Sequence, residues 1–133
     1  MTQEEKELLL KDLCARLPYG VMCATTDNDG SLPNIWEIVK ADMLNEDFFL
    51  IHDSYEASRT VDVKEVRPYL FPLSSMTEEQ TEELIKLINT GQNDNNEFMR
   101  SLCRIDFYHK HHIDYRGLIP MGLAIDANGL DIY

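Results

Sequence analysis

The 133-residue sequence lacks the short motifs that usually indicate a catalytic or nucleotide-binding site. It contains no Gly-x-x-x-x-Gly-Lys phosphate loop, no Gly-x-Gly-x-x-Gly dinucleotide motif and no Gly-x-Ser-x-Gly nucleophile turn. Its cysteines, Cys14, Cys23 and Cys103, are too far apart to form a Cys-x-x-Cys zinc or redox motif. We therefore expect no cofactor.

Long apolar runs are also missing. No stretch of 18 apolar residues could cross a membrane, and the acidic segment Met1–Glu5 does not have the apolar character of a signal peptide. We therefore expect a protein of the reducing cytoplasm that makes no membrane contact.

Basic side chains are scarce, because 12 Lys and Arg stand against 24 Asp and Glu, for a net charge of −12. Residues 1–66 hold 14 acidic and 6 basic side chains, and residues 67–133 hold 10 and 6, so the excess is spread along the chain. Such a surface repels phosphate backbones, and we expect no direct binding of nucleic acid. The charge serves solubility, or it attracts a basic protein partner by imitating a nucleic acid.

The composition, 44% hydrophobic and 27% charged, is that of one globular domain over residues 1–133. A helix is predicted at the N-terminus. Thr2 and Glu5 form a capping box, Leu9 and Leu13 belong to an apolar stripe at helical spacing, and Pro18 lies where the helix must stop.

An antiparallel sheet of about four strands is predicted next. Apolar and β-branched runs alternate with turn-forming residues at 27–30 and 45–47, and the runs themselves occupy residues 21–26, 34–41, 48–51 and 56–63. The short spacing between the predicted strands favours an antiparallel meander. We expect this sheet to curl, and a small closed barrel is one form that the curled sheet can take. The segment 66–73 carries Pro68 and Pro72, and is predicted to be an extended connector outside the sheet ladder.

Two helices are predicted in the second half of the chain, so the fold class is α+β. One runs from Thr77 to Gly91 and the other from Asn96 to His112, with a polar loop at 92–96 that we expect to be mobile. Each carries a predicted buried stripe, made of Leu84, Leu87 and Ile88 in the first helix and of Phe98, Leu102, Ile105 and Tyr108 in the second. The last residues, 123–133, form either a hairpin about Asn-Gly or an irregular tail.

Residues 67–77 and 112–124 resemble a family of short proteins from gut Bacteroides-type bacteria and their phages, a family without an assigned activity. The resemblance implies a small accessory protein of a mobile or phage-derived element. It gives no residue a role.

Histidines gather at the end of the last predicted helix. His109 and His112 share a helical face, and Asp114 follows them, but a zinc site needs three or four ligands and the His-Glu-x-x-His pattern is absent. We therefore expect a polar helix end that suits the helix dipole. A metal-dependent hydrolase using His109, His112 and Asp114 stays open as an alternative.

Three other side chains are candidates for binding. Arg116 beside Tyr115 can bind a carboxylate or anchor an interface, and Trp36 can serve as an exposed anchor or as part of the core. Together with the acidic charge and the missing motifs, these residues favour a non-enzymatic protein-binding accessory module. A structural or self-assembling protein is the other alternative.

Overall fold

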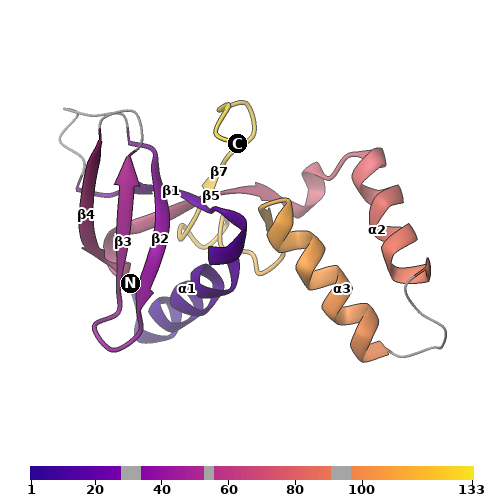
Figure 1. Ribbon diagram of the computed structural model, residues 1–133, viewed down its shortest axis with the longest axis horizontal. Coiled ribbons are helices and arrows are strands. Elements are labelled where there is room, and N and C mark those ends of the chain that lie inside the picture. The colour runs from indigo at the N-terminus through magenta and orange to yellow at the C-terminus, as the bar shows by residue number, and fades with distance from the viewer. Residues whose placement is uncertain (28–33, 53–55, 91–96) are drawn as a thin grey trace.

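The computed structural model describes residues 1–27, 34–52, 56–90 and 97–133 and has an α+β architecture (Figure 1). The helices are α1 (Gln3–Arg16), α2 (Glu78–Thr90) and α3 (Glu97–Lys110), with 3-10 turns η1 (Leu17–Tyr19), η3 (Val63–Glu65) and η4 (Leu73–Ser75). The strands are β1 (Met22–Thr25), β2 (Trp36–Asp42), β3 (Asp47–His52), β4 (Ala57–Asp62), β5 (Val66–Pro72), β6 (Ile113–Asp114) and β7 (Ile125–Asp126). Strands β2, β3 and β4 stand side by side at one end of the molecule, and α2 and α3 form a helical pair at the other.

The predicted N-terminal helix is confirmed. Glu5 N–H donates to the Thr2 hydroxyl and Thr2 N–H donates to the Glu5 carboxylate, both at 3.1 Å, which completes the capping box. After η1, Gly20 adopts a left-handed φ of 74° and donates its N–H to the carbonyl of Leu17. This turn sends the chain from α1 into β1. No helix among the described residues is long and apolar enough to span a membrane.

The sheet is mixed and larger than predicted. Its order is β4-β3-β2-β1-β5-β6, with β7 also paired to β5. Strands β1 to β5 pair antiparallel, which confirms the meander, whereas β6 and β7 pair parallel to β5 over two residues each. The estimate of about four strands was therefore too low, and within the described residues the sheet does not close into a barrel, because β4 and β6 lie at opposite ends of its order.

The segment predicted as a connector is strand β5, which lies between β1 and the short strands β6 and β7. Thr26 N–H donates to Glu65 O at 2.8 Å, so the antiparallel pairs alternate and Pro68, opposite Cys23, falls at a non-hydrogen-bonded position. The nitrogen of Pro68 then points away from β1, and the ring removes no bond from the β1–β5 ladder. The prediction was wrong because a proline disrupts a strand only where its nitrogen faces the neighbouring strand, and the nitrogen of Pro68 faces away from β1.

Helix α1 covers one face of the sheet. Leu9 and Leu13 pack in the main core with Phe48 and Leu50 of β3, and all four are fully buried. The side chains that alternate with them on β3 point the other way, among them Phe49 on the side that α1 does not cover. We call this side of β2, β3 and β4 the outer face.

Helices α2 and α3 confirm the predicted helical segments and part of their predicted buried stripes, because Leu84 is buried and Ile88 and Tyr108 pack beside it. Leu84 and Phe107 form a small second core with Ile113. Phe98 is 69% exposed, and Leu87, Leu102 and Ile105 are exposed as well. Phe107 is nine residues from Phe98, which is two and a half helical turns, so the two side chains lie on opposite sides of α3 and only one side packs.

In the described structure, residues 123–126 and 130–133 do not pair with each other as a hairpin. Instead β7 lies beside β5, and Ala127 N–H donates to Leu70 O at 2.8 Å. The end of the chain is irregular but anchored, because the Tyr133 hydroxyl donates to Tyr69 O at 2.7 Å and accepts from Met22 N–H at 3.0 Å. The predicted turn at 27–30, for the most part, and the predicted mobile loop at 92–96 lie outside the described residues.

Candidate functional site

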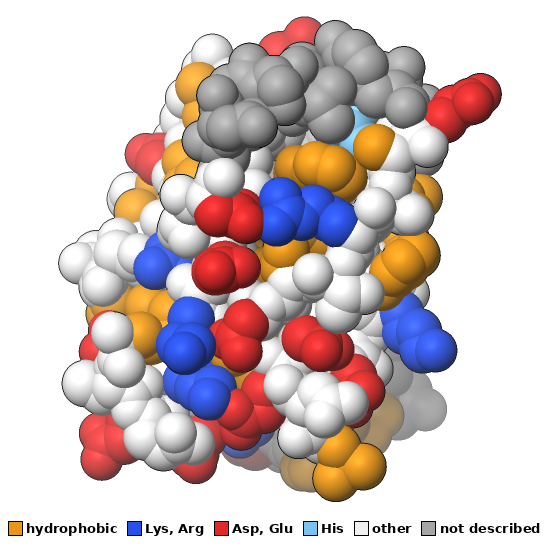
Figure 2. Space-filling view, turned by 90° about the vertical axis from the view of Figure 1, so that its left-hand side faces the viewer, with side chains coloured by type: hydrophobic (Ala, Val, Ile, Leu, Met, Phe, Trp, Pro, Cys, Tyr) orange, Lys and Arg blue, Asp and Glu red, His pale blue; other side chains and the backbone are white. Residues whose placement is uncertain are grey.

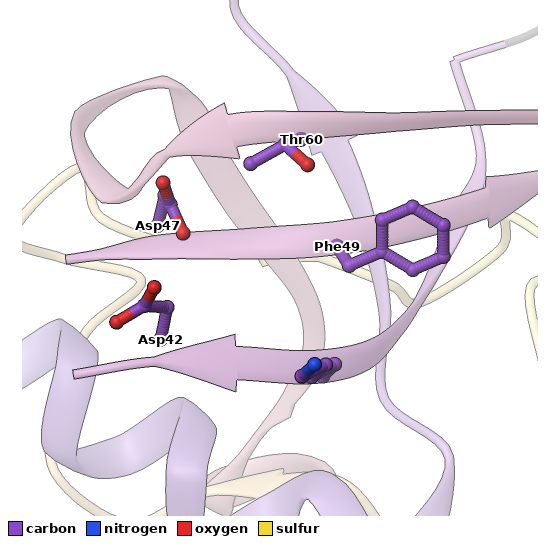
Figure 3. A pocket seen from close by; sticks show the side chains of 5 residues that line it. Asp42, Asp47, Phe49 and Thr60 are labelled. Carbon is purple, nitrogen blue, oxygen red and sulfur yellow. The ribbon is translucent and has the colours of Figure 1, made fainter. Parts of the chain in front are cut away.

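The outer face carries a hollow of about 370 Å³. Asp42 and Asp47 lie beside each other at one end, and Phe49 and Thr60 lie at the other (Figure 3). Lys40 completes the described lining, so the hollow combines two carboxylates, one ammonium group, one aromatic ring and one hydroxyl. Three neighbouring strands supply these side chains, and the site is therefore held on rigid elements rather than on loops.

Strand register places three carboxylates in one line. Asp42 is directly opposite Asp47, and Asp47 is directly opposite Asp62 on β4. Residues directly opposite in antiparallel strands share a face, with Cβ atoms about 5 Å apart. We call these three residues the aspartate row. Like charges so placed repel one another, and the repulsion is relieved by a cation that approaches the row.

The carboxylate of Asp42 is fixed in place by the turn that follows β2. It accepts hydrogen bonds from the N–H groups of Asn45 and Leu44, at 3.1 and 3.0 Å, and from the Asn45 side-chain amide at 2.7 Å. These hydrogen bonds lower the pKa of Asp42 below its usual range, and the bond from the Asn45 backbone has the largest effect. Asp42 is therefore charged at neutral pH.

Basic side chains only partly balance this region. Lys6 forms an ion pair with Glu46, and its charge also interacts with that of Asp62, whereas Lys40 in the hollow helps to lower the pKa of Asp42. Seen from the β4 side, acidic side chains cluster over the middle and lower part of the molecule, with lysine and arginine side chains among them (Figure 2). On this side of the molecule the acidic side chains form small groups separated by lysine and arginine side chains, rather than one unbroken acidic patch.

The structure places Trp36 in the core. Its side chain is 5% exposed, its ring meets the His52 ring edge-on at 5.3 Å between centroids, and the Arg59 guanidinium lies 6.0 Å from the ring. Of the two roles considered for Trp36, core packing is the one that the structure shows. An exposed binding anchor would need a ring open to solvent, whereas the Trp36 ring is buried.

Tyr115 and Arg116 are brought together, but their polar groups bind inside the molecule. Arg116 Nε donates to Asp12 at 2.9 Å, and its guanidinium lies 5.0 Å from the Tyr115 ring. The Tyr115 hydroxyl is 2.7 Å from His109 Nε2. The acidic partner of Arg116 is thus a residue of α1, 104 positions away, and not the neighbouring Asp114.

Asp12 and Arg16 are the residues that the sequence analysis missed here. Both side chains are fully buried; Arg16 Nε donates to Asp12 at 2.7 Å, and Arg16 Nη2 donates to Ile113 O at 2.8 Å. A signal existed, because positions 12 and 16 fall on the same side of α1 as the apolar residues Leu9 and Leu13. A charged pair inside an apolar stripe indicates a buried ion pair.

The candidate metal ligands are not gathered about one point. Asp114 accepts the N–H groups of Leu118 and Ile119, both at 2.9 Å, and so shapes the turn after β6. His112 stacks on Tyr133 at 3.6 Å between ring centroids. Among the described residues, no group of three or more His, Cys, Asp or Glu side chains is placed to hold a metal ion.

Burial decides how these histidines titrate. It lowers the pKa of His112 to about 4, with a smaller contribution from the positive charge of Arg16. Burial also lowers the pKa of His109. Both rings are therefore neutral at neutral pH; His109 forms a hydrogen bond with Tyr115, and His112 packs against Tyr133.

The aspartate row could not be found by motif, because its members are separated by 5 and 15 positions and meet only through strand register. No protein-family model matches the chain, and no curated protein or solved structure matches it either. The geometry and electrostatics of the outer face therefore carry the functional argument.

Proposed function

We propose that this protein is a non-enzymatic accessory module that binds a protein partner with a basic surface, and that the outer face is where the partner docks. The observation that carries the proposal is the aspartate row: Asp42, Asp47 and Asp62 stand opposite one another beside an open hollow. A partner that brings Lys or Arg side chains relieves the repulsion within the row.

The chemistry of the hollow supports binding rather than catalysis. A general acid or base works best when its pKa is near the operating pH, and hydrogen bonds move the pKa of Asp42 the opposite way. The described lining holds no histidine or cysteine beside the carboxylates. An aromatic ring, Phe49, and the alkyl chain of Lys40 add apolar contact area of the kind that protein interfaces use.

The test is affinity capture with a matched pair of variants. Immobilised wild-type protein should retain host proteins with basic segments, and Asp47→Lys should lose them because it places a positive charge in the middle of the row. Glu7→Lys, an equal change of charge on the exposed side of α1, is the control and should retain them. Equal retention by the wild type and Asp47→Lys contradicts the proposal, and an equal loss in both variants would mean that binding follows net charge alone.

The origin of the chain in a mobile or phage-derived element belongs to the same proposal. An acidic accessory protein of such an element could occupy a basic, nucleic-acid-binding host protein as a decoy. Competition decides this version: the captured partner should release DNA when the wild-type protein is added, and it should keep DNA when Asp47→Lys is added.

The metal-dependent hydrolase alternative has its own test. His109, His112 and Asp114 already bind Tyr115, Tyr133 and the Leu118–Ile119 backbone, respectively. Isothermal titration with zinc should give the same result for the wild type and for a His109→Ala, His112→Ala double variant. Zinc binding that depends on these two residues would revive the alternative.

One observation favours the self-assembly alternative, namely the exposed apolar stripe of α3. Phe98, Leu102 and Ile105 lie at helical spacing on the exposed side of the helix, where a second copy could pack. The net charge of −12 opposes association of like chains at low salt. Light scattering in low and high salt distinguishes a monomer from a defined oligomer.

A further inference from the structure

We infer that the partner is bound as an additional β-strand along β4, and that the segment which adds itself carries Lys or Arg at alternate positions. This inference rests on the proposed function and specifies how the outer face would recognise its ligand. Strand addition to an exposed sheet edge is a common way to bind extended peptides, because main-chain hydrogen bonds hold the segment and alternate side chains select it.

Strand β4 offers the edge. It is the end strand of the sheet order, and within the described part of the chain it pairs only with β3. Val63 N–H donates to Glu46 O at 3.0 Å, so that pair is hydrogen-bonded and the β3–β4 pairs alternate from it. The backbone groups of Ser58, Thr60 and Asp62 therefore point away from β3, toward the open side.

The same three residues also face outward with their side chains. Ser58 and Thr60 are exposed, and Asp62 is half-buried, whereas Val61 between them is buried in the core. A strand beside β4 would thus meet free backbone groups at its edge and extend the outer face with its own alternate side chains. The span from Ser58 to Asp62 is about 13 Å, enough for a segment of about five residues.

Charge selects what that segment carries. A residue opposite Asp62 on an added strand becomes the fourth member of a row that already holds Asp62, Asp47 and Asp42. A carboxylate there would lie directly opposite the Asp62 carboxylate, whereas a Lys or Arg would pair with it. Two residues along the segment, the next outward side chain lies opposite Thr60, beside the hollow and the Phe49 ring.

A blocked synthetic heptapeptide with lysine at alternate positions and valine or threonine between them is the probe. Wild-type protein should bind it, and the same peptide with glutamate in place of lysine should not bind. A third peptide keeps the lysines but is N-methylated on the backbone nitrogens of one edge. It should bind about tenfold more weakly or worse, because methylation removes the edge donors and leaves the charge unchanged.

Thr60→Pro tests the edge from the protein side. The Thr60 N–H points away from β3, so proline removes an edge donor without removing a bond between β3 and β4. Binding of the lysine peptide should fall about tenfold or more. Thr60→Val, which keeps the N–H and the branched side chain, is the matched control and should bind as the wild type does.

Amide hydrogen exchange on the wild-type protein keeps the test decisive if Thr60→Pro does not fold. The lysine peptide should slow exchange at Ser58 and Thr60, whose N–H groups face the open edge, relative to Ser101 on α3. Unchanged exchange at the two edge amides in the presence of bound peptide overturns the inference.

The outcomes separate this inference from the function it rests on. If the N-methylated and unmethylated lysine peptides bind equally well, the partner docks on the face and not along the edge; the strand-addition inference is then wrong and the basic-partner proposal stands. If no lysine peptide binds, the strand-addition inference also fails, while affinity capture with Asp47→Lys still decides the proposed function independently.

Discussion

Asp12 is buried and pairs with two arginine side chains, the buried Arg16 and the partly exposed Arg116. Its carboxylate accepts from Arg16 at 2.7 Å and from Arg116 at 2.9 Å, and neither Asp12 nor Arg16 is exposed. Removing one partner of a buried ion pair costs more than the pair contributes, because the remaining charge stays buried without compensation. The region that holds Tyr115, Arg116 and the candidate metal ligands is therefore a structural junction between α1, α3 and β6.

Asp12→Asn should lower the free energy of unfolding by about 3–5 kcal/mol, because it leaves Arg16 and Arg116 without a countercharge. Glu7→Gln on the exposed side of α1 is the control and should change it by less than about 0.5 kcal/mol. Urea unfolding followed by circular dichroism measures both. Equal stability of the two variants would show that the junction does not hold the fold.

His112 should make the protein less stable in acid. Burial lowers its folded pKa to about 4 from 6.5, so the unfolded chain takes up a proton first as the pH falls. The stability contributed by the neutral ring is complete above about pH 6.5 and is lost as the pH falls toward 4. His112→Phe keeps a ring against Tyr133 and removes this proton uptake.

The measurement is the urea midpoint at pH 7 and pH 5 for the wild type and for His112→Phe. The wild type should lose more stability between the two pH values than the variant does. The carboxylates with lowered pKa are common to both proteins and cancel in the comparison. An equal loss in both would mean that His112 is as accessible to protons in the folded state as in the unfolded state.

At the level of the elements, α3 shows why a stripe at helical spacing is not enough to predict burial. The sequence predicts both helices correctly, since capping residues and periodicity are local properties. Which side of α3 packs depends on where α2 and β6 lie, and that is set by the long-range contacts of Phe107 with Leu84 and Ile113. The same holds for β5, where Pro68 is acceptable only because of the edge that its nitrogen faces.

Leu84 and Leu102 provide a matched test of this arrangement. Leu84→Ala should cost about 2–5 kcal/mol of stability, because it opens a cavity in the second core beside Phe107. Leu102→Ala, on the exposed side of α3, should cost less than about 1 kcal/mol. Thermal or urea unfolding distinguishes the two. A comparable loss for Leu102→Ala would mean that the exposed stripe is covered in solution, as the self-assembly alternative requires.

For the molecule as a whole, composition predicted an acidic globular protein, and the order of helical stripes, apolar runs and turn residues predicted the α+β class. It could not predict the aspartate row, because Asp42, Asp47 and Asp62 become neighbours only when the register of β2, β3 and β4 is known. A shift of one residue in any of these strands would turn its aspartate toward the core side. The candidate site is thus a product of topology rather than of local sequence.

The charge of the whole molecule predicts how partner binding depends on salt. If the outer face binds a basic segment, affinity should fall steadily as ionic strength rises, because exposed charges are screened over a Debye length of about 8 Å at physiological salt. Asp47→Asn should weaken binding at low salt and flatten the salt dependence. Binding by fluorescence anisotropy at several salt concentrations measures both effects. A salt-independent affinity would indicate an apolar interface elsewhere on the molecule.

Chemical-shift mapping by two-dimensional NMR tests the central claim most directly. Isotope-labelled protein titrated with the lysine peptide should show its largest amide shifts at Ser58 and Thr60 on β4, smaller shifts at Asp47 on β3, and none at Tyr115 and Arg116. Shifts centred on Tyr115 and Arg116 would contradict a binding site on the outer face.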